Sequence, residues 1–137
     1  MTVLVVENLK THFFTKAGVV KAVDDVSFGV AAGKVMGLVG ESGSGKTVTG
    51  FSIMGLVDPP GRIVGGRILL EGHNLLDRDN AGMRGLRGDR IAMIFQDPMM
   101  TLNPVLRIDR QMTEAIHAHA KVSEPQARAR AREALVA

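Results

Sequence analysis

The sequence contains no cysteine, no tryptophan and no tyrosine. Without cysteine, disulfide bonds and thiolate metal sites are excluded. Five phenylalanines are too few for a platform that stacks the bases of single-stranded nucleic acid. The N-terminal MTVLVVENLKTHFF has neither the basic start nor the long apolar core of a secretory signal. The longest uncharged, largely apolar run, 47–57, is far shorter than the roughly 20 residues that span a bilayer. We therefore expect any membrane association to be peripheral.

Charge is nearly balanced along the chain. The 17 basic and 14 acidic residues give a net charge of +3, which suits an anionic ligand without requiring nucleic acid. The arginines of the ARARAR run at 127–132 spread around a predicted helix, so we interpret them as a solvated face. At 137 residues, 45% of them hydrophobic and 23% charged, the chain has the composition of one soluble globular domain.

Apolar runs between turn residues predict strands first and helices later. The expected strands are residues 3–6, 19–20, 26–30, 35–39, 65–75 and 90–95. We expect 35–39 and 90–95 to be buried on both faces, because their apolar residues are continuous. Helical spacing starts at Lys46 and should stop at 58–61, where two prolines and a glycine follow an aspartate.

Two further helices are predicted near the C-terminal end. Apolar residues recur at helical spacing over 107–120, which indicates an amphipathic helix. Another helix should begin at Ser123, because Ser123 and Gln126 have the spacing of a capping box. His117 and His119 are two residues apart and so do not share a helix face, and we interpret them as surface or groove histidines.

The most informative stretch is a glycine-rich loop between an expected strand and an expected helix. It fits G-x-x-x-x-G-K-[ST] at every fixed position with Gly40, Glu41, Ser42, Gly43, Ser44, Gly45, Lys46 and Thr47. Glycines allow positive φ and close backbone approach to a ligand. Successive N–H groups can then surround an anion at the positive end of the following helix. We predict that Lys46 contacts the β- and γ-phosphates and that the Thr47 hydroxyl binds Mg²⁺.

Two longer stretches make the interpretation more specific. VENLKTHFFTKAGVVKAVDDVSFGVAAGKVMGLVGESGSGKTVTG and, downstream, RIAMIFQDPMMTLNPVLRI resemble the ATP-binding subunits of ABC importers. The likeness is to the oligopeptide/dipeptide branch, which also includes nickel importers. It implies the N-terminal part of an α/β P-loop NTPase domain of the ABC type. An antiparallel β subdomain and part of the core sheet would occupy 1–97, and the start of the helical subdomain would occupy 98–137.

The resemblance also implies roles for single residues. Phe13 lies where the family places an aromatic side chain that stacks on adenine, and Phe14 is the alternative. Gln96 corresponds to the Q-loop glutamine, which reaches Mg²⁺ and the attacking water. Gly40, Ser42, Gly43, Ser44, Gly45, Lys46 and Thr47 would bind ATP, with Mg²⁺ held by Thr47 and Gln96.

Partners follow from the same resemblance. The Q-loop and helical subdomain would form a groove for integral-membrane permease subunits, with Met99 and Met100 as candidate lining residues. A second ATP-binding subunit would complete a dimer, and an extracytoplasmic solute-binding protein would act indirectly. We expect no nucleic-acid partner, and a peripheral location on the cytoplasmic face of the plasma membrane.

Other family elements do not occur in this sequence. There is no signature segment of the LSGGQ type, and no Walker B aspartate, catalytic glutamate or switch histidine can be assigned. We therefore expect the 137 residues to be part of a longer protein and to show negligible ATPase activity alone, because phosphoryl transfer depends on such positioning groups. Whether the chain itself is an enzyme stays open.

Two other functions fit the sequence less well. One is a non-catalytic protein that keeps nucleotide or permease binding without turnover. The other is a different P-loop enzyme, such as a small-molecule kinase, which the wording FQDPMMTLNP argues against. Nickel instead of peptide as the imported solute also stays open.

Overall fold

The computed structural model describes residues 1–97 and 101–137. The candidate permease-contact residues Met99 and Met100 lie outside them. The chain divides into two compact units, Met1–Arg84 and Gly85–Ala137, and each is described by itself. The expected division at residue 97 remains a prediction.

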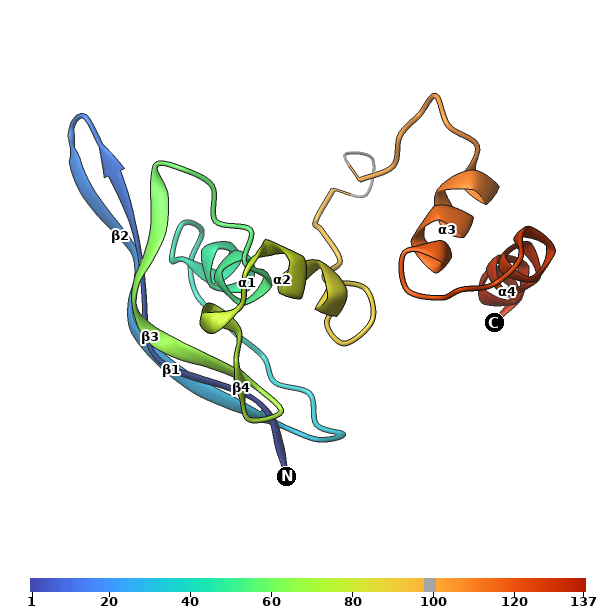
Figure 1. The fold of residues 1–137 in the computed structure, drawn as a ribbon. Helices are drawn as coiled ribbons and strands as arrows, with labels where there is room; N and C mark the ends of the chain where they lie inside the picture. Colours follow the sequence, from blue (N-terminus) through green and yellow to red (C-terminus); the bar gives the residue numbers. More distant parts are fainter. Residues whose placement is uncertain (98–100) are drawn as a thin grey trace. The chain divides into compact units, whose positions relative to one another are not determined.

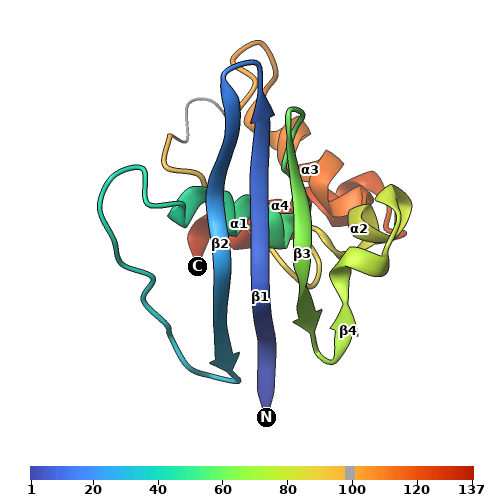
Figure 2. The same cartoon turned by 90° about the vertical axis from the view of Figure 1, so that its left-hand side faces the viewer.

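The first unit is built on a four-stranded antiparallel sheet with strand order β2-β1-β3-β4 (Figures 1 and 2). Its strands are β1 (Thr2–Thr15), β2 (Gly18–Ala31), β3 (Gly61–Leu70) and β4 (His73–Asn74). β1 is the central strand and pairs with β2 and β3 along most of its length. The expected runs 3–6, 19–20 and 26–30 are therefore parts of two long strands joined by a tight hairpin.

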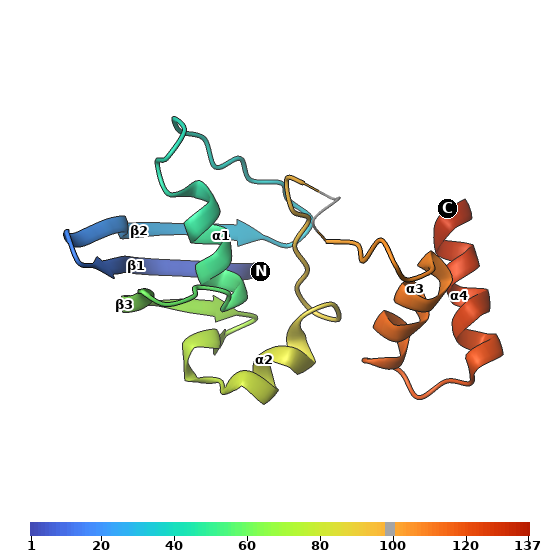
Figure 3. The ribbon, with the colours of Figure 1, turned by 90° about the horizontal axis from the view of Figure 1, so that it is seen from above.

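Helix α1 (Lys46–Met54) covers one face of this sheet (Figure 3). The core of the unit is made of Val6, Leu9, Val23, Met54, Ile68, Leu70, Leu75 and Met83, all buried. The helix starts at Lys46 as predicted. It ends earlier than predicted, because Gly55 takes the left-handed conformation (φ 63°) and its N–H bonds back to the last turn. Short helix η1 (Leu75–Asp77) follows β4, and α2 (Asn80–Leu86) was not predicted.

Two expected strands do not form. Residues 35–39 are an extended loop with Val35 and Val39 at 101% and 90% exposure. In residues 90–95, Ile91 forms an isolated bridge with Arg87 rather than part of a strand, and Ile94 is 96% exposed. A buried strand needs neighbours on both edges, and among residues 1–97 and 101–137 no strand pairs with either run. The prediction of two buried core strands was wrong for this structure.

The second unit contains the helical pair α3 (Ile108–His117) and α4 (Glu124–Val136). Among the described residues of this unit, the buried side chains are the small ones of Thr113 on α3 and of Ala127 and Ala131 on α4. The start of α4 is confirmed: the Gln126 carboxamide oxygen accepts hydrogen bonds from the Ser123 N–H and hydroxyl, at 3.0 and 3.1 Å. No helix in the part of the chain that the structure describes is long and apolar enough to cross a membrane.

Candidate functional site

The glycine-rich loop runs into the N-terminus of α1, as the motif predicts. Gly43 and Gly45 have φ of 80° and 92°, conformations that favour glycine. The Ser44 N–H donates to the Glu41 carbonyl at 3.2 Å and closes a turn within the loop. At the helix N-terminus Gly45 provides no side-chain cap, and no acidic residue lies in the first turn. The helix end therefore keeps its positive character for an anion.

The Lys46 side chain folds back over the loop that precedes it. Its Nζ donates to the Gly40 carbonyl at 2.7 Å, to the Glu41 carbonyl at 2.5 Å and to the Ser44 hydroxyl at 3.2 Å. The ammonium group is thus held beside the turn formed by the loop. A positive charge held beside a glycine-rich turn, at the N-terminus of a helix, is compatible with a phosphate site.

Gly40 lies close to the Ser44 side chain of the same loop. An ideal Cβ on this residue would lie 2.5 Å from the Ser44 hydroxyl oxygen and 3.9 Å from Lys46 Nζ. A side chain at position 40 would therefore move the Ser44 hydroxyl, while its contact with Lys46 Nζ would be an ordinary one. Ser42 is exposed within the loop.

Gly45 is the residue at which the loop meets the sheet. A Cβ on Gly45 would clash with the Ala22 carbonyl oxygen and would lie 3.7 Å from Val23 Cγ2. Ala22 is an extra residue in β2, because the strand pairs Thr11 with Val23 and then His12 with Lys21. The bulge carbonyl thus faces the backbone of Gly45, and the sheet fixes the helix end of the phosphate loop.

The first turns of α1 are held by hydroxyl groups. Thr49 is buried, and its N–H and hydroxyl both bond to the Gly45 carbonyl, at 2.8 and 2.9 Å. Ser52 is also buried, and its hydroxyl contacts that of Thr11 on β1 at 2.7 Å. Thr47, the candidate magnesium ligand, is exposed in the first turn. A hydroxyl there is a hard oxygen donor of the kind Mg²⁺ prefers, so the residue fits the role predicted for it.

Phe13 and Phe14 lie on opposite faces of β1. Side chains alternate along a strand, and β1 has no extra residue between Thr11 and Phe13. Since Thr11 contacts α1, Phe13 lies on the face that carries the helix and the phosphate loop. Phe14 lies on the other face, where the Arg62 guanidinium carbon is 4.2 Å from its ring centroid. Of the two rings, Phe13 is therefore the one on the face that carries the phosphate loop.

Gln96, the other predicted magnesium ligand, belongs to the second unit and is exposed. Its role as a sensor of Mg²⁺ and water therefore stays a prediction. The structure adds Thr11, Ser52 and Ala22 to the surroundings of the site, and also Gly61, which faces the Phe13 ring. Sequence reasoning missed all four. Only a known strand register would have found them, because none belongs to the motif.

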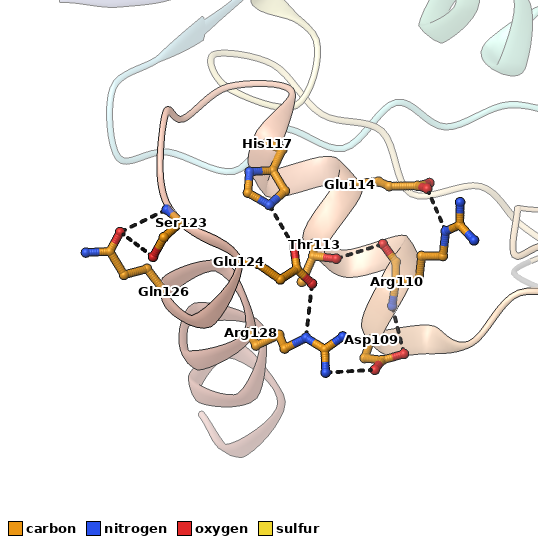
Figure 4. A network of polar contacts seen from close by, with 9 residues as sticks. All are labelled: Asp109, Arg110, Thr113, Glu114, His117, Ser123, Glu124, Gln126 and Arg128. Carbon is orange, nitrogen blue, oxygen red and sulfur yellow. Dashed lines mark hydrogen bonds and ion pairs between the residues drawn. The ribbon is translucent and has the colours of Figure 1, made fainter.

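A separate polar cluster joins α3 to α4 in the second unit (Figure 4). Glu124 accepts hydrogen bonds from Arg128 Nε at 3.0 Å and, on its other oxygen, from His117 at 3.1 Å. Arg128, and to a smaller extent His117, lowers the pKa of Glu124 below its ordinary value. Arg128 also lies 3.8 Å from Asp109. Glu124 is therefore the shared partner that connects the end of α3 with the start of α4.

Comparison with known proteins places this geometry in a family. Residues 23–136 match the ABC transporter family. The chain is 47% identical over 135 residues to the oligopeptide transport ATP-binding protein AppD of Bacillus subtilis, covering 98% of this chain and 41% of that protein. It is 45% identical over 131 residues to a probable peptide ABC transporter ATP-binding protein, y4tR, of Sinorhizobium fredii, covering 95% and 39%. The chain thus spans about 40% of the length of these relatives.

Solved structures agree on the fold. The chain superimposes on the ABC transporter cassette MJ0796, described as dimeric, with a TM-score of 0.81 and 22% identity, over 95% of this chain and 54% of that one. A second structure of the same cassette, bound to ADP and Pi, matches equally well. The expected fold class, the N-terminal part of an ABC-type domain, is confirmed. The predicted likeness to the peptide branch is also confirmed, because both relatives are named as ATP-binding proteins of peptide or oligopeptide transporters. With most of its length matched, the chain belongs to the ABC transporter family.

Proposed function

We propose that this chain is the part of a peptide importer's ATP-binding subunit that binds ATP and Mg²⁺. The observation that carries the proposal is the arrangement of Lys46 over the glycine loop, next to the uncapped N-terminus of α1. Loop N–H groups, a helix dipole and an ammonium group all favour the same ligand, a chain of phosphates.

Each residue then has a distinct role. The backbone of the loop would surround the β-phosphate, through Gly40, Ser42, Gly43, Ser44 and Gly45. The Lys46 ammonium group would form ionic contacts with the β- and γ-phosphates. The Thr47 hydroxyl and Gln96 would hold Mg²⁺, which screens phosphate charge during transfer. Phe13 would stack on adenine from the helix-bearing face of β1.

At the level of the whole protein, the relatives' names support import of peptides. Hydrolysis would take place only in a dimer of full-length subunits, driving permease subunits in the membrane and, indirectly, an extracytoplasmic solute-binding protein. The subunit would lie on the cytoplasmic face of the plasma membrane. Peptide is favoured over nickel because the two relatives described above are named for peptides or oligopeptides.

The proposal is tested by titrating the chain with a fluorescent ATP analogue in the presence of Mg²⁺. Lys46→Ala removes the ammonium group, and we expect affinity to fall at least about tenfold, as for loss of a charge-assisted contact. Lys121→Ala, an exposed lysine of the second unit, is the matched control and should bind as the wild type does. Equal affinity of wild type and Lys46→Ala would contradict the phosphate-loop assignment.

A further inference from the structure

The hydroxyl pair of Thr11 and Ser52 lies at the junction of sheet and helix. Both side chains are fully buried, at 0% and 1% exposure, and their oxygens are 2.7 Å apart. They come from residues 41 positions apart in the chain, one on the central strand and one on α1. Buried polar contacts of this length are directional, so they fix a position more narrowly than an apolar contact does.

The direction of this hydrogen bond can be deduced. The Ser52 hydroxyl donates its one proton to the Val48 carbonyl at 2.7 Å. It can therefore only accept from Thr11, which makes the Thr11 hydroxyl the donor. Two hydrogen bonds in series therefore connect β1 with α1. Thr11 donates to Ser52, and Ser52 donates to the Val48 carbonyl, one helical turn nearer the phosphate loop.

Each end of the bond is close to one half of the proposed nucleotide site. Thr11 is two residues from Phe13 on the same face of β1, where the base would stack. Val48 is two residues from Lys46, where the phosphates would bind. Gly45, packed against the Ala22 carbonyl, is a further contact between helix and sheet.

We propose that Thr11 is a positioning residue that sets the spacing between Phe13 and the phosphate loop. The inference rests on the proposed function and deepens it. A ligand with two linked parts gains from the second contact only when the two subsites have the spacing of the linker. Thr11 would therefore decide how much the base adds to the affinity of the triphosphate.

The test compares ATP with inorganic tripolyphosphate, which has the phosphates and no base. Both compete with a fluorescent ATP analogue on the wild type, Thr11→Val and Thr11→Ser. Valine keeps the shape and removes the hydroxyl, and Ser52 keeps its own bond to Val48. We expect Thr11→Val to weaken ATP about tenfold and tripolyphosphate less than about twofold. Thr11→Ser keeps the donor and should retain the wild-type ratio.

The outcomes separate the inference from the function on which it rests. If the wild type binds neither competitor, the proposed function fails, and the inference with it. If the wild type binds both competitors but Thr11→Val leaves the ratio of the two affinities unchanged, whether or not both become weaker, Thr11 has only a structural role. Should Thr11→Val fail to fold, the double variant T11V/S52A, which removes both hydroxyls, takes its place. An unchanged ratio of ATP to tripolyphosphate affinity in the double variant would again contradict the positioning role.

Discussion

The ring of Phe13 lies against the backbone of Gly61, its partner on β3. An ideal Cβ on Gly61 would be 2.6 Å from one ring carbon and 2.9 Å from two others. Gly61 is buried, and no positive φ explains the glycine. The absence of a side chain at this position is what lets the aromatic ring lie where it does.

Gly61→Ala should therefore displace the Phe13 ring. We expect the variant to lose about 1–3 kcal/mol of unfolding free energy from overpacking, and to bind ATP more weakly while tripolyphosphate affinity changes little. Chemical denaturation and competition binding measure the two effects. Gly65→Ala, also on β3, is the control, because its Cβ would make only ordinary contacts with Lys10, at 3.6 Å or more. Unchanged ATP affinity in Gly61→Ala would argue against Phe13 as the base platform.

Gly45→Ala tests the contact between loop and sheet. The substitution introduces a methyl group against the Ala22 carbonyl at a φ of 92°, so strain and a clash add. We expect a loss of about 2 kcal/mol or more in unfolding free energy, and ATP binding weakened together with tripolyphosphate binding. Gly37→Ala has no positive φ and nothing within 4 Å of its Cβ, so it should be nearly neutral. A stable Gly45→Ala that binds normally would show that this contact does not fix the loop.

The Glu124 cluster predicts a pH dependence in the second unit. In the folded chain, Arg128 and His117 lower the pKa of the Glu124 carboxyl below its value in the unfolded chain. The carboxylate then stabilises the fold fully above the ordinary value near 4.5, and this contribution is lost as the pH falls through the lowered pKa. Glu124→Gln should melt below the wild type at neutral pH, by a few °C at most for so exposed a group. At low pH, where Glu124 is protonated, the two proteins should melt at the same temperature.

Glu133→Gln, in the same helix, is the control for Glu124→Gln. Thermal unfolding followed by circular dichroism from about pH 3 to pH 7 gives the comparison. A difference between Glu124→Gln and wild type that persists unchanged at the acid end would contradict the ionic role of the cluster.

The sequence predicted the local features well. The motif located the phosphate loop and the first residue of α1, and Ser123 with Gln126 located the start of α4. These features depend on residues a few positions apart, whose chemistry acts within one turn. The helix expected over 107–120 is present as Ile108–His117, although Ile108 is 47% exposed rather than buried.

Features that depend on distant partners were not predictable in the same way. The apolar runs 35–39 and 90–95 indicate residues that favour burial, but an apolar run does not supply the neighbouring strand that would bury it. The Thr11–Ser52 bond and the Phe13–Gly61 contact depend on strand register and on where α1 crosses the sheet. A single sequence gives neither, since threonine, serine and glycine at such positions have many other uses.

The exposed run at 35–39 has a thermodynamic consequence for the loop that follows it. Gly45 fixes the loop at its helix end, whereas among the described residues no strand pairs with the end near Val39. A ligand that orders this end must offset the conformational entropy that the residues lose. A strand that paired with 35–39 would supply that ordering in advance and raise the affinity for nucleotide. By linkage, bound nucleotide would strengthen the pairing of that strand by the same factor.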